Sequence, residues 1–307
     1  MKHVATIAEL RSLLDAARAE GRTVGFAPTM GYLHEGHVSL MRAARTETEV
    51  VVASVFVNPL QFAAHEDLDD YPRDLERDAA LAEEAGVDVL FVPSSAEMYP
   101  DGHPIATTVT VDGVSAGFEG ASRPTHFAGV ATVVAKLLSI VGPCRAYFGE
   151  KDFQQLAVVA RMVADLSMPV EVVGCETVRE DDGLAMSSRN AYLTETQRAA
   201  APVVHRALRC GAAAVLAGET DPAEIRALMA RVVEEATGPE TDSSLDYADV
   251  VDAATLTPFP DGHDGLYGDL RLLAAVRFAT TRLIDNVGVT VPPAPCRTAK
   301  TAPTQRS

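Results

Sequence analysis

The 307-residue sequence has no tryptophan, only four cysteines and few basic side chains. Lys and Arg together number 26 against 43 Asp and Glu, so the formal net charge is −17 at pH 7. So acidic a chain lacks the broad positive field that attracts duplex nucleic acid or an anionic membrane surface, and we expect neither as a partner. A small anionic substrate remains compatible with this charge, because a few well-placed cations can bind it locally.

Long apolar runs are also missing. No stretch approaches the ~18 consecutive apolar residues of a membrane-spanning helix, and the first residues lack the apolar segment of a signal peptide. The cysteines, at positions 144, 175, 210 and 296, lie far apart and form no C-x-x-C pair. This spacing favours reduced thiols and a cytoplasmic protein over a zinc ribbon or a disulfide framework.

Hydrophobic residues make up 47% of the chain, which is enough for hydrophobic cores. At about 150 residues per domain, the length predicts two domains. In the first part, short valine-rich runs alternate with segments of helical periodicity. Strands are predicted at 24–28, 50–57, 87–92, 145–148 and 170–175, and helices at 7–17, 73–85, 127–141 and 152–166. Strands that alternate with helices predict a parallel α/β sheet.

The pattern changes after about residue 178. Two alanine-rich segments, 194–217 and 222–237, predict helices, and 245–251 and 270–278 predict strands of a smaller α+β domain. Residues after 289 are rich in Pro, Thr and Ala without periodicity, which predicts a disordered tail. The expected boundaries are therefore 1–178, 179–288 and 289–307.

Several common motifs are absent or incomplete. The chain has neither G-x-G-x-x-G after its first predicted buried strand nor the phosphate-binding G-x-x-x-x-G-K-[ST]. His34 and His37 are three residues apart, whereas the zinc-binding helix H-E-x-x-H needs a spacing of four. Residues 113–117 match the nucleophile elbow G-x-S-x-G, but the glycines and proline that follow oppose the helix that an elbow requires. We interpret this match as chance.

A candidate site follows the strand predicted at 24–28. Pro28 and Gly31 lead the chain out of the sheet at its carboxyl edge, where open α/β sheets bind ligands. A helix that begins just beyond would direct its free N–H groups at that edge, as an anion site requires. His34 and His37 can both face one ligand there, and Gly36 between them permits a close approach. The alternative, that two histidines merely cap a helix, is the weaker interpretation.

The motif H-x-G-H after a first strand resembles that of the nucleotidyltransferase superfamily, which includes the class I aminoacyl-tRNA synthetases and places ATP phosphates on the two histidines. Further blocks narrow this resemblance, namely FVNPLQF at 56–62, YPR at 71–73, RPTHF at 123–127, GEKDFQQL at 149–156 and MSSRN at 186–190. In this order, from residue 6 to about residue 286, the chain resembles the pantothenate synthetase (pantoate–β-alanine ligase) family. The resemblance implies a Rossmann-like nucleotidyltransferase domain followed by a smaller α+β lid domain.

The resemblance also implies a two-step reaction. The carboxylate of pantoate attacks the α-phosphorus of ATP, which is bound with Mg²⁺, to give pantoyl adenylate and pyrophosphate. The amine of β-alanine then attacks the adenylate to give pantothenate and AMP. The implied substrates are pantoate, β-alanine and ATP, and the implied assembly is a homodimer through the N-terminal domain.

Roles for single residues follow from the same resemblance. The implied catalytic set, which contacts the ATP phosphates or closes over them, is His34, His37, Lys151, Ser187 and Arg189. Further implied ATP contacts are Pro28, Thr29, Met30, Gly36, Gly149, Asp152, Val178, Met186 and Ser188. The implied pantoate contacts are Met30, Gln61 and Gln155, with Asn58 as a phosphate or β-alanine contact and Asp78 as a Mg²⁺ ligand.

Plainer interpretations exist for some of these residues. Lys151 has the alternative of an ordinary solvated lysine, and Ser187 with Ser188 that of a turn or helix cap. The carboxylates around Asp78 have the alternative of a solvated helix face. For the whole chain, one alternative is another H-x-G-H adenylyltransferase that uses a different acid or transfers AMP to a nucleotide. The other is a catalytically silent relative that binds a nucleotide or a partner.

Overall fold

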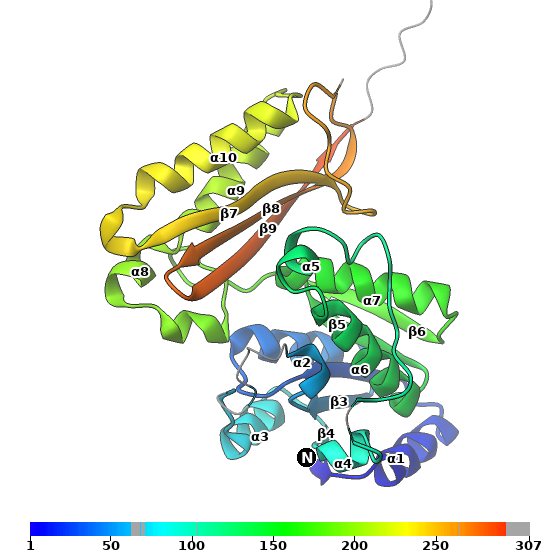
Figure 1. The fold of residues 1–307 in the computed structure, drawn as a ribbon. Coiled ribbons are helices and arrows are strands. Elements are labelled where there is room, and N and C mark those ends of the chain that lie inside the picture. The colour runs from blue at the N-terminus through cyan, green and yellow to red at the C-terminus, as the bar shows by residue number, and fades with distance from the viewer. Residues whose placement is uncertain (63–67, 69–70, 103, 264, 293–307) are drawn as a thin grey trace, which may run out of the picture.

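The computed structural model describes residues 1–62, 68, 71–102, 104–263 and 265–292. Two sheets organise this part of the chain (Figure 1). The first has six parallel strands in the order β1-β4-β3-β2-β5-β6, and the second has three antiparallel strands in the order β7-β8-β9. The parallel strands are β1 (Lys2–Val4), β2 (Val24–Thr29), β3 (Val50–Val55), β4 (Val89–Phe91), β5 (Cys144–Gly149) and β6 (Val170–Cys175). The antiparallel strands are β7 (Ser243–Asp252), β8 (Gly268–Phe278) and β9 (Thr281–Val291).

Helices connect the strands of both sheets. Those of the first part are α1 (Ile7–Ala19), α2 (Glu35–Glu47), α3 (Leu75–Glu84), α4 (Ser95–Met98), α5 (Phe118–Ser122), α6 (His126–Val141) and α7 (Phe153–Asp165). Those of the second part are α8 (Glu195–Ala200), α9 (Val203–Leu216) and α10 (Pro222–Ala236). The described residues also include the 3₁₀ turns η1 (Pro59–Gln61), η2 (Glu150–Asp152), η3 (Ser188–Tyr192) and η4 (Pro239–Thr241). No helix of the described residues has the length and apolar character needed to cross a membrane.

The central parallel strands are apolar on both faces because both faces are covered. In β2, Phe26 belongs to a core that includes residues of α1, α6 and α7, whereas Ala27 belongs to a second core with residues of α2 and α3. Alternate residues of β3 divide in the same way. This arrangement explains the nearly continuous valine-rich runs, since a strand covered on both sides has no polar face. The predicted Rossmann-like sheet with a smaller α+β unit is confirmed.

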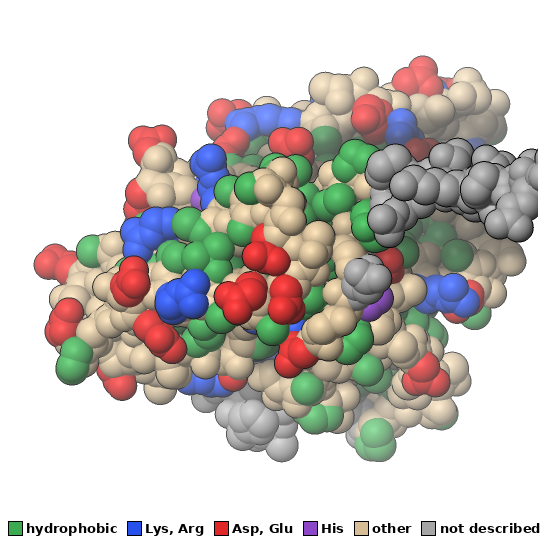
Figure 2. All heavy atoms as spheres, turned by 90° about the horizontal axis from the view of Figure 1, so that it is seen from above, with side chains coloured by type: hydrophobic (Ala, Val, Ile, Leu, Met, Phe, Trp, Pro, Cys, Tyr) green, Lys and Arg blue, Asp and Glu red, His purple; other side chains and the backbone are tan. Residues whose placement is uncertain are grey.

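The second sheet has one face packed against helices. Residues of α9 and α10 form a third core with alternate residues of β7, β8 and β9. Figure 1 shows these two helices on the side of the sheet that faces away from the six-stranded sheet, while the opposite side turns toward α5 and α7 of the first part. Seen from the helix-covered side, Asp and Glu side chains are spread widely over the surface (Figure 2), in keeping with the acidic composition.

Three details differ from the sequence-based expectation. Strands β1 and β9 were not expected, and the tail predicted from residue 289 begins inside β9, where Val289 pairs with Leu270 of β8. The single helix expected at 194–217 is two helices, α8 and α9, with Pro202 as the N-cap of the second. Proline has no N–H to continue the hydrogen-bond ladder, so the helix breaks there. Residues 293–307, most of the predicted tail, lie outside the described residues, and the domain boundary near 178 stays a prediction.

Candidate active site

The carboxyl ends of β2 and β5 lie side by side, because these strands are neighbours in the six-stranded sheet. The chain continues from β2 to β3 on one side and from β5 to β6 on the other, so the strand order reverses between them. Open α/β sheets bind ligands in the crevice at such a point. The segment after β2 leads through His34 into α2, and the segment after β5 is the turn η2, which carries Lys151. The fold therefore brings the H-x-G-H motif and Lys151 to one edge of the sheet.

The two histidines form a reciprocal cap at the start of α2. The Nδ1 atom of His34 accepts the main-chain N–H of Gly36 at 3.2 Å, and the Nδ1 atom of His37 accepts that of His34 at 3.3 Å. A neutral imidazole carries one proton, so an accepting Nδ1 places that proton on Nε2. The rings lie against each other with centroids 4.1 Å apart. Capping and ligand binding are thus compatible roles, since capping uses Nδ1 and leaves an Nε2–H donor on each ring.

Both rings are held in the neutral form. Burial lowers the pKa of His34, and the nearby charge of Lys151 lowers it further. Burial lowers the pKa of His37 to about 3, and His34 beside it adds to the effect. At neutral pH the pair therefore presents two N–H donors without a positive charge. The positive charge of the site comes from lysine and arginine.

The position of the His34 ring leaves room only for a glycine at position 36. A Cβ atom at this position would lie 2.9 Å from the Nδ1 and Cε1 atoms of His34, closer than such contacts occur in proteins. Any side chain would push the ring out of its place. The sequence pattern suggested that this glycine permits a ligand to approach, and the structure adds that it permits the observed position of His34.

Turn η2 holds a cation and an anion together. The Nζ atom of Lys151 lies 3.4 Å from Oδ1 of Asp152, and only 16% of the lysine side chain is exposed. Burial by itself would raise the pKa of Asp152, but the positive charges of Lys151 and Arg189 outweigh it, so the pKa lies below its usual value. Asp152 is therefore an ionised acceptor. Lys151 is not the ordinary solvated lysine of the alternative interpretation.

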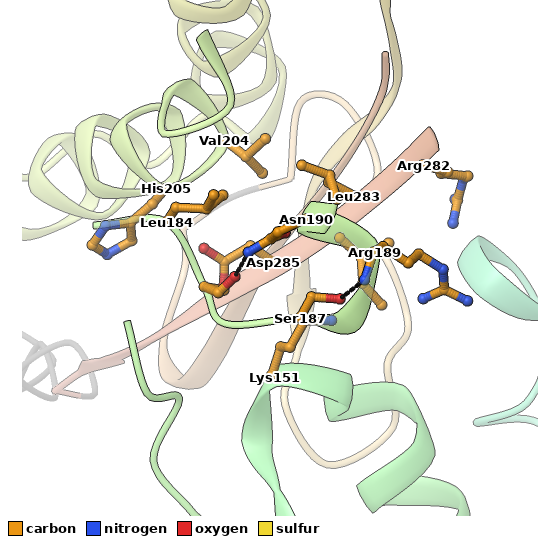
Figure 3. A pocket seen from close by; sticks show the side chains of 12 residues that line it. Lys151, Leu184, Ser187, Arg189, Asn190, Val204, His205, Arg282, Leu283 and Asp285 are labelled. Atoms are coloured by element: carbon orange, nitrogen blue, oxygen red, sulfur yellow. Dashed lines mark hydrogen bonds between the residues drawn. The ribbon is translucent and has the colours of Figure 1, made fainter. Parts of the chain in front are cut away.

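A hairpin after β6 leads to the serine–arginine segment. The main-chain N–H of Met186 donates to the carbonyl oxygen of Val178 at 2.9 Å, which places these two predicted ATP contacts opposite each other. Ser187 caps η3, since its Oγ accepts the N–H of Arg189 at 3.2 Å. Lys151, Ser187 and Arg189 line one narrow cavity, and in Figure 3 Lys151 reaches from η2 toward Ser187. The predicted cations of the two segments thus line one cavity beside β9.

The polar residues after β3 form a connected group. The Nε2 atom of Gln61 lies 2.8 Å from Sδ of Met30, so two predicted pantoate contacts lie together. Asn58 is 1% exposed, and its side chain donates to Gln61 Oε1 and Gly129 O and accepts from Leu60 N and Tyr99 Oη. An asparagine amide can make four such bonds. All four are used, so Asn58 positions Gln61 and does not fit the expected contact with phosphate or β-alanine.

The remaining predicted contacts differ in their burial and in whether their polar atoms already form hydrogen bonds within the protein. Thr29 is buried, donates to Ser54 O at 2.7 Å and accepts from Gly31 N at 3.2 Å, so its hydroxyl serves the turn after β2. Gln155 lies half-buried in the first turn of α7. Four others are half-buried around the same edge, namely Pro28, Gly149, Met186 and Ser188.

Asp78, the expected Mg²⁺ ligand, is engaged by the main chain, and its contact with Mg²⁺ stays a prediction. It is 1% exposed, and its two carboxylate oxygens accept the main-chain N–H groups of Tyr32 at 2.8 Å and Leu33 at 2.6 Å. Gly31 and Tyr32 have left-handed backbone conformations, with φ of 86° and 50°. Asp78 thus holds the tight turn that precedes His34. No group of three metal-ligating side chains occurs among the residues that the structure describes.

Several residues at this site were missed from the sequence. Buried Gln154 donates to the carbonyl oxygens of residues 114, 116 and 117 and fixes the segment before α5. Asp285 and Asn286 of β9 reach Arg179 and η2, respectively. Two consecutive polar residues inside the apolar run 283–289 were the available signal for the latter pair.

Fold and site together define a two-part α/β protein in which a histidine-capped helix start, a lysine and an arginine lie at the carboxyl edge of a parallel sheet. Within that class, the chain belongs to the pantoate-beta-alanine ligase family, whose family model matches residues 2–288. It is 53% identical to the pantothenate synthetase of Sinorhizobium medicae over 93% of this chain and 95% of that protein. It is 52% identical to that of Moorella thermoacetica over 94% and 98%, respectively.

Solved structures agree with this assignment. The crystal structure of pantothenate synthetase from Thermus thermophilus is similar with a TM-score of 0.84 and 52% identity, over 95% of this chain and all of that one. The pantoate-beta-alanine ligase from Francisella tularensis, crystallised with beta-gamma ATP and β-alanine, is similar with a TM-score of 0.72 and 32% identity. That similarity covers 94% of this chain and 97% of the other. The chain described here is therefore a ligase of this family.

Proposed function

We propose that this enzyme condenses pantoate with β-alanine through a pantoyl adenylate, at the edge of the sheet between β2 and β5. The observation that carries the proposal is the combination of two neutral Nε2–H donors with two cations, Lys151 and Arg189, from separate segments. This combination suits a polyphosphate chain, which needs many donors and compensation of its charge. Family membership supports the proposal, as does the relative from Francisella tularensis, which was crystallised with beta-gamma ATP and β-alanine.

In the first step a carboxylate oxygen of pantoate attacks the α-phosphorus of ATP, a P–O bond forms, and pyrophosphate leaves. The imidazole donors and Lys151 would contact phosphate oxygens, and Arg189 would balance the charge that develops on pyrophosphate. No base from the protein is needed, because the attacking carboxylate is already ionised. Catalysis then rests on orientation and charge compensation.

In the second step the neutral amine of β-alanine attacks the acyl carbon, an amide bond forms, and AMP leaves with the electrons of the broken C–O bond. The nitrogen then loses its proton to solvent or to the departing phosphate. Gln61 and Gln155 would hold the hydroxyl and carboxyl oxygens of pantoate through both steps, since an amide offers donor and acceptor without charge. Asp152 would accept the ribose hydroxyls.

Magnesium would reach this site with the phosphates of ATP, which bind it through oxygen. Each oxygen of Asp78 already accepts one main-chain N–H, so we assign this residue to the turn before His34 and derive no step through it. We further propose, on family membership, that the chain acts as a cytoplasmic homodimer paired through its N-terminal domain. Sedimentation at several concentrations tests the dimer.

Isotope transfer tests the intermediate. With ¹⁸O in the carboxylate of pantoate, an adenylate route transfers one labelled oxygen to AMP when the amide forms. A route through an acyl phosphate would instead release ADP and labelled phosphate, and would overturn the proposal.

Exchange of labelled pyrophosphate into ATP tests the substrate. We expect exchange to require pantoate and to proceed without β-alanine. Exchange that requires another acid would indicate a different H-x-G-H adenylyltransferase. If the protein binds ATP tightly but catalyses no exchange, it would be a catalytically silent relative.

A further inference from the structure

Two neighbouring residues of β9 hold the two segments that carry the phosphate-facing cations. Asp285 and Asn286 are buried, with 5% and 4% of their surface exposed. Successive side chains of a strand point to opposite faces of its sheet, so adjacent residues can reach two different segments. Their partners are more than 100 residues away in the chain, in the hairpin after β6 and in η2.

Asn286 holds η2. Its Nδ2 donates to the carbonyl oxygens of Glu150 and Lys151, both at 2.9 Å, and its Oδ1 accepts from Nε of Arg271 at 2.6 Å. Arg271 continues the contact, since its Nη2 lies 2.9 Å from a carboxylate oxygen of Glu150 and its guanidinium stacks 3.9 Å from the ring centroid of Phe153. The carbonyl oxygens of the first two residues of η2 are therefore both hydrogen-bonded to the second sheet.

Asp285 holds the hairpin. Its two carboxylate oxygens accept hydrogen bonds from Nη1 and Nη2 of Arg179, at 2.6 and 3.0 Å, so the ion pair is bidentate. Arg179 also donates to the carbonyl oxygen of Gly183 at 3.1 Å, which closes the hairpin that leads to Ser187 and Arg189. Bidentate arginine–carboxylate pairs fix direction as well as distance.

We propose that Asn286 is a positioning residue for Lys151, and that Asp285 and Asn286 together set η2 in a fixed relation to the hairpin, so that cations from both parts of the chain meet one phosphate chain. The inference rests on the proposed phosphate role of Lys151. It makes the second sheet part of the phosphate site, although neither β9 residue has been assigned a contact with substrate.

The first experiment compares Asn286→Ala and Asn286→Asp with Thr290→Ala in the full chain. Asn286→Asp keeps the size of the side chain and the acceptor for Arg271, but it replaces the donor to two carbonyl oxygens by an acceptor. This variant takes the place of Asn286→Ala if the alanine variant does not fold. Thr290→Ala removes a contact of the same strand, with Asp269 at 2.7 Å, away from η2. The readout is pantoate-dependent ATP–pyrophosphate exchange, well below the melting temperature of each variant.

Both Asn286 variants should lower kcat of exchange by about 10- to 100-fold, the cost of a small misplacement of a catalytic group. KM for pantoate should change by less than about two-fold, because Gln61 is held by Asn58 and Met30 and Gln155 lies in α7, outside η2. Thr290→Ala should behave like the parent chain. Asn286 variants that are less stable but exchange at the parental rate would show a merely structural role and overturn the inference.

A double-mutant cycle with Lys151→Ala separates this inference from the proposed function. If Asn286 acts through Lys151, Asn286→Ala should cost less than about two-fold once Lys151 is alanine, since residues that act as a unit are not additive. Full additivity would overturn the positioning role while leaving the phosphate role of Lys151 in place. Parental exchange by Lys151→Ala alone would instead remove the phosphate role, and the inference with it.

Discussion

The Nδ1 atom of His37 accepts the main-chain N–H of His34, 3.3 Å away, across the first turn of α2. This bond fixes the tautomer of His37 and connects helix capping to the proposed phosphate contact, because the ring can cap the helix only with its proton on Nε2. The motif H-x-G-H thereby supplies a donor whose direction is set by the backbone. The two nitrogens of the ring can be tested separately.

His37→Asn and His37→Gln form a matched pair. Asparagine places a polar atom near the former Nδ1 and so retains the cap without the outer donor, whereas glutamine places an N–H near the former Nε2. We expect His37→Asn to keep its stability but to lower pantoate-dependent exchange by about 10²- to 10³-fold, the cost of one lost donor to a developing anion. His37→Gln should retain more activity. Equal activities of the two variants would contradict the donor role of Nε2.

The depressed pKa of His37 makes a prediction about stability and pH. Burial, aided by His34, lowers this pKa to about 3 from the ordinary value of 6.5. Between these values the unfolded chain binds more protons than the folded one, so the free energy of unfolding should fall as the pH is lowered from 6.5 toward 3. One such group contributes a slope of up to ~1.4 kcal/mol per pH unit. In urea titrations between about pH 4 and pH 7, His37→Gln should show a shallower slope than the parent chain.

Asp78→Asn distinguishes a structural carboxylate from a metal ligand. The amide can accept one of the two N–H groups of Tyr32 and Leu33, and its NH₂ opposes the other, so the variant should lose about 1–3 kcal/mol of stability. Exchange should fall because the turn before His34 is loosened. The dependence of the remaining activity on Mg²⁺ concentration should stay as in the parent chain. A large increase in the Mg²⁺ needed for half-maximal activity would show instead that Asp78 binds the ion.

Gly36→Ala should separate activity from stability. The new Cβ would lie 2.9 Å from the ring of His34 and displace it, while alanine is a better helix former than glycine. We expect a higher KM for ATP and an exchange rate lower by at least about 10-fold, with little change in melting temperature. The control is Glu35→Ala on the same turn, which removes only an exposed ion pair with Arg42. An active Gly36→Ala would show that His34 tolerates another position.

The part of the site that the sequence could predict is local. The order strand, turn, His34, Gly36, His37, helix is contained in one short segment, and burial on both faces makes the central strands recognisable as apolar runs. Strand β1 escaped prediction because it has three residues, of which only Val4 is buried. Strand β9 escaped because Asp285 and Asn286 interrupt its apolar pattern.

The rest depends on contacts between distant segments. Asn58 is saturated by partners as far away as Gly129, and Asp78 is buried by a turn 45 residues earlier, so a contact role and a structural role look alike in the sequence. Likewise, the burial of Asn286 depends on η2, which precedes it by more than 130 residues. Residue type was enough to nominate these positions, but only the fold shows which polar atoms are already used.

A last prediction concerns the ion pair between α5 and β9. Nη1 of Arg282 contacts both carboxylate oxygens of Glu119, at 2.6 and 2.5 Å, and Tyr247 donates its hydroxyl to the same carboxylate at 3.0 Å. The side chains of the pair are only 12% and 14% exposed. Arg282→Met would therefore leave a buried carboxylate without its cation and should cost about 3–5 kcal/mol of stability.

The double variant Arg282→Met with Glu119→Gln removes both charges of this pair and should recover most of that loss, because the cost comes mainly from the buried unpaired carboxylate. Asp246, the other partner of Arg282 at 2.5 Å, is 35% exposed and can be solvated by water. Chemical denaturation of the parent chain, both single variants and the double variant gives the coupling directly. The reverse order, with the double variant the least stable, would mean that the ion pair itself holds the two sheets together.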